Sequence, residues 1–584
     1  MTTHQADTTR DPITFAVIKN ALDTIVDEMA YNVMRTARSN IVRDVLDYST
    51  TLCDRSGNII SQAKTVALHL GAVPDAIEAV QAHFNDRIYP GDVIVLNDPY
   101  EGGMHLPDIF MFKPIFFREQ LEGFAVVIAH HCDMGGRVPG SNASDSTEIY
   151  QEGFRVPPLK LYERGERNET LFRLFEKNVR VPELVIGDLL SQYATCRMGE
   201  RQYIQLLEKY GPRVVEDYVG ALLQYAEDMT RRQIRDWPNG SYTFTDYIDG
   251  DGFSDASIPI KVTIKVDNGR LVVDFAGSAP QVRGAINSTF SFVKSATYLS
   301  VRCALDLEVP NNSGVFRCIE IHVPEGSVLN PHLPAPVAAR ALTGYRIVDT
   351  MLGCLAQIVP KKVRAAGEGG NTVVCLSGYD PAKAERFILV DMINGAWGGH
   401  SSQDGIEGVT NPSQNMSNLP IETLESRYPI RIEEFSYRQD SCGAGKWRGG
   451  LGLTRTYRVL SDQALLQLRS DRTHHAPYGL FGGLKGEKTR NTLTTNSEAV
   501  DLPGKATQFV ARDSVLRHEQ AGAGGYGDPL DRELASIERD LRNEKISNEF
   551  AQKHHGVAFD NEGKIDPGRT SALRKAERAR RLPQ

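Results

Sequence analysis

The sequence NDPYEGGMHLPDIFMFKPIFFREQLEGFAVVIAHHCD, residues 97–133, contains two long apolar runs that decide the fold of the region around them. The runs IFMFKPIFF and GFAVVIAHH flank the polar segment REQLEG, and this arrangement predicts a hairpin of two antiparallel strands. In such a pair the start of the first strand lies opposite the end of the second. We therefore expect Asp108, just before the first run, to face the neighbourhood of His131 and Cys132.

The same spacing of a histidine and an aspartate occurs on both sides of this hairpin. His105 and Asp108 precede the first strand, whereas His130 and Asp133 end the second. Neutral imidazoles and carboxylates that meet at one sheet edge suit Zn, Mn or Fe. A metal with an open coordination position can activate water or polarise a carbonyl. The repeated pair therefore predicts a metal centre at this edge.

A purely structural role is the alternative for both histidines. His105 would then cap its loop, and His130 would be a hydrogen-bonded core histidine at a strand end. The preceding apolar run, DVIVLND, ends in Asn97 and Asp98, which join the group if that strand is adjacent. The glycines and prolines in the loop from Pro99 to Pro107 bend and brace the backbone.

Composition and charge limit the classes of protein and partner. The 584 residues are 41% hydrophobic, enough for large cores, and a net charge of -8 gives no reason to expect nucleic acid or an anionic membrane as a partner. No apolar run approaches the length of a membrane span, and the start, MTTHQADTTRDP, is polar. The 8 cysteines include no CxxC pair, which argues against a zinc ribbon or redox dithiol. We expect a cytoplasmic protein with a small-molecule or protein partner.

The order of apolar patterns predicts a large, multi-lobed α+β chain with mixed and antiparallel sheets. Residues 12–40 show the spacing of an amphipathic helix, and Asn268-Gly269 indicates a hairpin turn. The expected regions are an N-terminal α+β metal-site region (1–164), a helical segment (165–237), an antiparallel β segment (238–284), a C-terminal α+β region (285–530) and a helical C-terminal tail (531–584).

Glycine-rich segments in the second half give weaker signals. GAGGYG, residues 522–527, contains the GxGxxG pattern, but RHEQA before it does not resemble a strand and DPL after it does not resemble a helix. No GxxxxGK[ST] phosphate loop occurs in the chain. Other glycine-rich segments place four polar residues in turns that either line a pocket or are simply solvated: Glu368, Asn371, His400 and Asp404.

Motifs from nearly the whole chain resemble one known family. The matching segments are DPITFAVIKNAL, LDYSTTLCDRSGNI, GDVIVLNDPYEGGMHLPD, AHHCDMGG, VVDFAGSAPQVRGAINS, GEGGN, TLESRYPIRIEEFSYRQDSCGAGKWRGGLG and GGYGDPL. With them the chain resembles the hydantoinase B/oxoprolinase family, the B-type subunits of ATP-dependent hydantoinases, and is also similar to the large subunits of acetone and acetophenone carboxylases. At Met104 and Cys132 it departs from the Thr and Ala that are usual in the family.

The resemblance implies a division of labour between two subunits. An A-type partner uses ATP to phosphorylate the carbonyl oxygen of a cyclic amide or ketone, and the B-type subunit completes the reaction at a divalent metal, Zn or Mn with Fe as a further option. By resemblance the metal ligands fall on Asp47, His105 and His130, with Asp108 and Asp133 in or beside the coordination sphere. The last four of these residues are the expected catalytic groups.

Four functions are compatible with these features. The first is a hydrolase subunit in a hetero-oligomer that opens an activated hydantoin or lactam ring, and the second is a subunit of an ATP-dependent ketone carboxylase. A metal-dependent oxygenase with two histidines and one carboxylate is a third, which the whole-chain resemblance argues against. The fourth is a non-catalytic scaffold for the ATP-binding subunit. The reaction products separate the first two.

Overall fold

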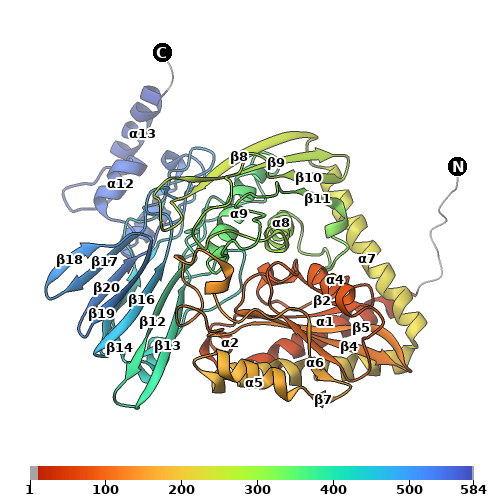
Figure 1. Ribbon diagram of the computed structural model, residues 1–584. Helices are drawn as coiled ribbons and strands as arrows, with labels where there is room; N and C mark the ends of the chain where they lie inside the picture. Colours follow the sequence, from red (N-terminus) through yellow and green to blue (C-terminus); the bar gives the residue numbers. More distant parts are fainter. Residues whose placement is uncertain (1–10, 582–584) are drawn as a thin grey trace.

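The computed structural model describes residues 11–581, and these fold into sheets and helices of the predicted α+β class. The polar start at residues 1–10 and residues 582–584 of the basic tail lie outside the described part. Figure 1 shows an N-terminal sheet lobe, a second sheet packed on central helices, two C-terminal sheets and a group of C-terminal helices. Within residues 11–581, no helix is both long and apolar enough to cross a membrane.

The N-terminal lobe is one antiparallel sheet in the order β2-β1-β5-β4-β3-β6-β7. Helices α1 (Pro12–Thr36) and α6 (Pro182–Tyr210) pack together along one face of this sheet (Figure 1). The strands are β1 (Tyr48–Asp54), β2 (Ile59–Gln62), β3 (Val93–Leu96), β4 (Asp108–Phe117), β5 (Gln120–His130), β6 (Leu159–Glu163) and β7 (Glu166–Arg167). The short helices α2 (Asn40–Arg43) and α3 (Ala67–Leu70) and the longer α4 (Val73–Phe84) lie between them in sequence.

The predicted hairpin is confirmed, with a tighter turn than the sequence indicated. Strands β4 and β5 pair from Asp108, opposite His130, to Phe117, opposite Gln120. Arg118 and Glu119 both have positive φ values, 48° and 68°, which fits a two-residue turn that matches the twist of the strands. The second strand therefore begins within REQLEG rather than after it, and the residue opposite Asp108 is His130.

Helices then lead to a second sheet. The segment predicted as helical contains α5 (Glu169–Asn178), α6 and α7 (Pro212–Arg235). The next sheet has the order β11-β10-β9-β8, and Asn268 and Gly269 form its predicted turn with φ values of 46° and 91°. Its strands are β8 (Gly240–Ile248), β9 (Ile258–Asp267), β10 (Arg270–Asp274) and β11 (Ile319–His322), with β10 and β11 parallel. Helix α9 (Arg340–Leu355), buried on all sides, packs between this sheet and α8 (Phe290–Cys303).

Two antiparallel sheets and a helical group form the C-terminal part. The first sheet contains β12 (Thr372–Asp380), β13 (Glu385–Ile393), β16 (Gln463–Arg469) and β19 (Lys505–Ala511). The second contains β14 (Ile430–Tyr437), β15 (Leu453–Val459), β17 (Arg490–Thr495), β18 (Glu498–Asp501) and β20 (Val515–Glu519). The helices are α10 (Ile421–Arg427), α11 (Leu534–Arg542), α12 (Asn548–His555) and α13 (Pro567–Arg581). The five regional boundaries expected from the sequence stay a prediction.

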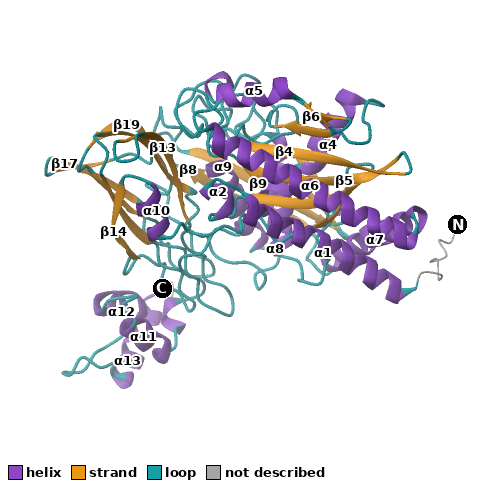
Figure 2. Ribbon diagram, turned by 90° about the horizontal axis from the view of Figure 1, so that it is seen from below, coloured by secondary structure: helices purple, strands orange, loops and turns teal. Residues whose placement is uncertain are grey.

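The glycine-rich segments pack backbone against backbone beside the second C-terminal sheet. The amides of Gly443 and Gly525 donate to the carbonyls of Ala523 and Leu484 at 2.8 and 2.9 Å. Figure 2 shows long loops, in teal, between the C-terminal sheets and the helices α11, α12 and α13. GAGGYG follows β20 directly, so the expectation that no strand precedes it is wrong, but a short 3-10 turn at Pro529–Asp531 follows it instead of a helix. Its glycines serve packing rather than a dinucleotide site.

Substituting a glycine in this packed region should destabilise the protein. A Cβ on Gly522 would lie 1.8 Å from the Ser441 carbonyl oxygen, so Gly522→Ala should destabilise the protein by about 3 kcal/mol or more. Gly220 in α7 is the control, because a Cβ there meets nothing within 4 Å. Gly220→Ala should stabilise the protein by about 1 kcal/mol. Thermal denaturation of both variants tests this, and equal melting temperatures would contradict it.

Candidate metal centre

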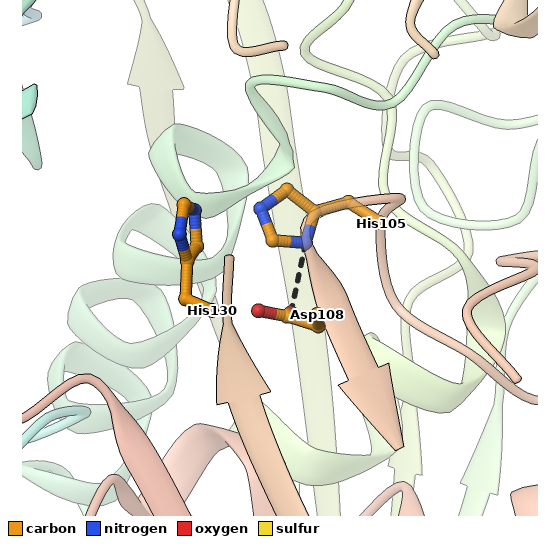
Figure 3. A group of neighbouring side chains, drawn as sticks. All are labelled: His105, Asp108 and His130. Atoms are coloured by element: carbon orange, nitrogen blue, oxygen red, sulfur yellow. Dashed lines mark ion pairs between the residues drawn. The ribbon is translucent and has the colours of Figure 1, made fainter. Parts of the chain in front are cut away.

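The structure brings His105, Asp108 and His130 together at one end of the β4–β5 hairpin. One potential ligand atom from each lies within 4.8 Å of the other two, and all three side chains are buried. Asp108 is the first residue of β4 and His130 is the last residue of β5, whereas His105 comes from the loop just before β4 (Figure 3). Three of the residues predicted from the sequence therefore converge as expected.

The loop that presents His105 is held by backbone contacts. The Asn97 side-chain amide donates to the Leu106 carbonyl at 2.6 Å, and its oxygen accepts from the Val156 amide at 2.7 Å. A Cβ on Gly103 would lie 2.6 Å from the Asp98 carbonyl oxygen, so only glycine fits there. The prediction that Asn97 and Asp98 join the ligands is not met. Asn97 braces the loop, and the Asp98 carboxylate pairs with Arg155 at 2.5 Å.

Several buried polar atoms at this place have no hydrogen-bond partner within the described residues. They are both ring nitrogens of His105, Oδ1 of Asp108, Nδ1 of His130 and Oδ1 of the neighbouring Asp47. Although Nδ1 of His105 lies 2.8 Å from Oδ2 of Asp108, the two atoms are not aligned for a hydrogen bond. Each such buried atom costs about 1–3 kcal/mol if left unsatisfied. A bound cation would take one nitrogen from each histidine and an oxygen of Asp108, so it would satisfy several of these atoms together.

Charge at the centre favours a cation over protons. Burial, followed by the Arg340 guanidinium, lowers the pKa of His105 to about 4, and burial also holds the pKa of His130 well below its usual value. Burial would raise the pKa of Asp108, but His105 and Arg340 outweigh it and hold that pKa well below the ordinary value. Two neutral imidazoles and one ionised carboxylate are donors that suit Zn, Mn or Fe.

Asp47 lies beside the three central residues. Its Oδ1 is 3.5 Å from Nε2 of His69, which in turn lies 3.9 Å from Oδ1 of Asp108. The Asp47 carbonyl accepts a hydrogen bond from the His130 amide at 3.1 Å. Burial, with a smaller contribution from Asp108, raises the pKa of Asp47 to about 8. His69 was not found from the sequence, because a lone histidine in the apolar run TVALHLGAV resembles a core residue.

Asp133 is the predicted ligand that the structure does not bring to the centre. Its carboxylate accepts from the Gly140 amide at 2.9 Å, from the Arg180 amide at 2.7 Å and from the Arg180 guanidinium at 3.0 Å. The chain leaves the sheet after His130, so the strand alternation that aims His130 does not extend to Asp133. We assign Asp133 to anchoring the loop after β5.

The two other side chains at this strand end also have different roles. His131 points to the opposite face of the sheet, where Nε2 lies 3.0 Å from Oε1 of Gln192 in α6. This follows from the two-residue alternation of a strand. Cys132 is buried, and burial raises the pKa of its thiol well above the usual value, so it stays protonated.

Two arginines that the sequence did not reveal complete the surroundings. Arg340, the first residue of α9, donates to Oδ2 of Asp108 at 2.5 Å. Arg469, the last residue of β16, donates to Oδ1 of Asn142 at 2.6 Å, and the Asn142 amide lies 3.5 Å from Nε2 of His130. Both arginines come from elements more than 200 residues along the chain, so no local sequence pattern links them to the hairpin.

The polar residues of the glycine-rich segments divide between the centre and the scaffold. Asn371 accepts a hydrogen bond from Arg469 at 2.7 Å and so belongs to the surroundings of the centre. Asp404 instead forms a two-oxygen pair with Arg532, at 2.7 and 2.8 Å, and the half-exposed His400 contacts Ser402 at 3.0 Å. Glu368 is buried and accepts from the Gly370 amide at 2.8 Å. Whether these residues line a pocket stays a prediction.

The family model described as hydantoinase B/oxoprolinase matches residues 11–529. The chain belongs to this family. It is 35% identical to the B subunit of a putative D-/L-hydantoinase from Pseudomonas sp., over 97% of this chain and 98% of that protein. It is 33% identical to the beta subunit of caprolactamase from Pseudomonas jessenii, over 97% of this chain and 100% of the relative. The expected membership is confirmed.

Two solved structures share the fold of this hydantoinase B/oxoprolinase chain. The ATP-dependent caprolactamase of Pseudomonas jessenii superposes with a TM-score of 0.91 at 30% identity, covering 97% of this chain and 100% of that chain. Acetone carboxylase in its nucleotide-free structure also gives a TM-score of 0.91, at 18% identity, covering 98% of this chain and 84% of that chain. At that lower identity the likeness shows the fold alone.

Removing one imidazole should empty the centre. His105→Ala leaves two close donors, so metal affinity should fall by more than the roughly 10- to 100-fold loss that follows removal of an outer-shell partner. His83→Ala is the control, because His83 is exposed on α4. Bound metal per chain, measured by plasma emission spectrometry after dialysis, gives the answer. Full metal content in His105→Ala would contradict the ligand assignment.

Asp133→Asn should separate anchoring from ligation. The amide keeps the shape of the carboxylate but loses its charge and one acceptor, so the free energy of unfolding should fall by about 1–3 kcal/mol. Metal content should stay at the wild-type level, because the carboxylate already accepts hydrogen bonds from Gly140 and Arg180. Denaturant unfolding and metal analysis on one preparation test both parts. Loss of metal with unchanged stability would restore Asp133 as a ligand.

Proposed function

We propose that this chain is the metal-containing catalytic subunit of an ATP-dependent cyclic amidase. A partner subunit of the A type would use ATP to phosphorylate the carbonyl oxygen of a lactam or hydantoin, and this chain would open the activated ring. Relatives described as subunits of a caprolactamase and of a putative hydantoinase support the substrate class. Their description as subunits supports a hetero-oligomer.

One observation carries the proposal: two neutral histidines and one ionised aspartate meet with unpartnered atoms in the interior of a fold shared with a caprolactamase. Such donors fit a divalent ion, and the family resemblance adds Asp47, whose carbonyl accepts from the His130 amide at 3.1 Å. Zn and Mn are the first choices and Fe a further one. When bound, the ion would supply Lewis acidity to an oxygen of the activated group, which makes the carbon under attack more electrophilic.

The residues of the chain have separate tasks in this reaction. Phosphorylation makes the amide carbon electrophilic, so water adds there, the ring C–N bond breaks and the nitrogen takes a proton. A second water then releases phosphate from the acyl group. Asp108, which its neighbours keep ionised, and the two histidines would hold the divalent ion in position. Their burial excludes bulk water, which strengthens the electrostatic interactions within the site.

Ketone carboxylation is the alternative for the same fold. The sequence identity to the acetone carboxylase structure is 18%, whereas the identity to the caprolactamase structure is 30%. The fold supports both reactions equally, and the higher identity favours ring opening. We therefore place cyclic amides before ketones as the substrate class.

Reconstitution with the partner tests the proposed function. The wild-type chain, an A-type subunit, ATP and a divalent metal should convert a lactam or hydantoin to the ring-opened acid with release of phosphate, detected by mass spectrometry. His105→Ala should abolish ring opening, whereas His83→Ala should not change it. A carboxylated ketone in place of a ring-opened acid would favour the alternative, and oxygen consumption would point to an oxygenase. Unchanged activity in His105→Ala would indicate a scaffold.

A further inference from the structure

Arg469 is a buried cation that has no carboxylate partner among residues 11–581. Arg469 is the last residue of β16 and is 4% exposed. The guanidinium donates to two neutral amide oxygens, Oδ1 of Asn142 at 2.6 Å and Oδ1 of Asn371 at 2.7 Å. Its Nε has no partner among residues 11–581, but the same holds for the ion-paired Arg346, Arg455 and Arg472, so the missing carboxylate is what distinguishes Arg469. Burying an uncompensated charge costs several kcal/mol, so the position calls for a counter-charge.

Other buried arginines of this fold show what a compensated guanidinium looks like. Arg472 contacts Asp349 at 2.6 Å, and Arg346 contacts Asp471 at 2.6 Å. Arg455 contacts Asp391 at 2.9 Å. Each of these pairs joins two segments and balances charge within the core. Arg469 has hydrogen bonds that orient it but no ion pair among residues 11–581; the Asp47 carboxyl, whose pKa burial raises to about 8, acts on it only at longer range.

Arg469 also lies beside the candidate metal centre. The Asn142 amide that accepts from Arg469 reaches to within 3.5 Å of Nε2 of His130. Arg340 adds a second guanidinium, which lies over the Phe292 ring at 4.5 Å and donates to Asp108. Burial, and then the repulsion of Arg340, lower the pKa of Arg469 to about 9, so it stays charged at neutral pH. The Nε of Arg340 is likewise unpartnered among residues 11–581.

The surplus of positive charge points to an anionic ligand. Asp108 is shared by Arg340 and the histidines, so it does not neutralise Arg469, and a divalent cation at the centre would add further positive charge. The N–H groups of a guanidinium match the oxygens of a phosphoryl group. We infer that Arg469, together with Arg340, binds the phosphoryl group of the activated ring beside the metal centre. This inference rests on the proposed function, which supplies a phosphorylated substrate.

The amide side chains around Arg469 fit this role. Asn371 and Asn142 fix the direction of the guanidinium through their oxygens while leaving its charge free for a ligand. An aspartate at either position would form a closed ion pair and remove the attraction for phosphate. The backbone of Asn371 has a φ of 40°, a left-handed conformation that asparagine tolerates better than most residues.

Phosphate binding by the full-length chain tests the inference. Inorganic phosphate is titrated calorimetrically into wild type, Arg469→Gln, Asn371→Asp and Arg512→Gln, with metal content measured on each sample. Arg469→Gln and Asn371→Asp should weaken phosphate binding at least about tenfold. Asn371→Asp should also raise the melting temperature, because it gives the buried guanidinium a carboxylate partner. Arg512→Gln is the control, since Arg512 pairs with Asp462 at a half-exposed surface position.

The outcomes separate this inference from the proposed reaction. Equal phosphate affinity in wild type and Arg469→Gln, or no binding by wild type, would overturn the anion site. So would a lower melting temperature of Asn371→Asp with unchanged phosphate affinity. Ring opening by wild type with the partner and ATP is measured independently. Phosphate binding through Arg469 without ring opening would contradict the proposed reaction but not the anion site. Ring opening with an unchanged KM in Arg469→Gln would contradict the anion site but not the reaction.

Discussion

The register of β4 against β5 is the constraint on which the candidate centre depends. It sets Asp108 opposite His130, and the amides of His130 and His131 bond to the carbonyls of Asp47 and Pro107 at 3.1 and 2.8 Å. Backbone pairing thus fixes the relative positions of three segments before any side chain contributes. A slip of one residue would exchange the faces of His130 and His131, because side chains alternate along a strand. The imidazole would then lie against α6, where Gln192 is.

Segments from the second half of the chain pack around the centre at the end of the hairpin. The long segment between β5 and β6 is held from the far side, where Gln467 of β16 donates to the Pro139 carbonyl at 2.8 Å. Nearer the centre, Glu152 accepts from the amides of Val337 and Ala338, just before α9, at 2.8 and 2.9 Å. These contacts place Arg340 and Arg469 beside the hairpin. Assembly from distant parts explains how every side chain of the centre is buried.

Sequence reasoning succeeded where the determinants are local. The strand pattern predicted the hairpin and brought Asp108 and His130 to the same sheet edge, because both lie at strand ends. The expected register was off, since Asp108 pairs with His130 and not with His131 or Cys132. The same reasoning failed for Asp133, since the His-x-x-Asp spacing has no fixed geometry once the chain leaves the sheet. His69 carries no signal in its apolar run. Arg340 and Arg469 reach the centre through tertiary packing, which a single sequence does not encode in any pattern of spacing.

Buried charged side chains occur in two arrangements in this molecule, with and without an ion-pair partner, and the comparison between them points to the functional site. In the core between the sheets, Arg346 bonds to Asp246 and Asp471 at 3.0 and 2.6 Å, so charges cancel and segments are joined. At the candidate centre, by contrast, ring nitrogens and carboxylate oxygens stay unpartnered among residues 11–581, and Arg469 donates to two neutral amide oxygens instead of a carboxylate. Unsatisfied groups of this kind cost stability and persist only where the surrounding structure holds them in place. The compensated pairs supply that rigidity, and the uncompensated groups are the ones to which we assign the proposed metal and anion.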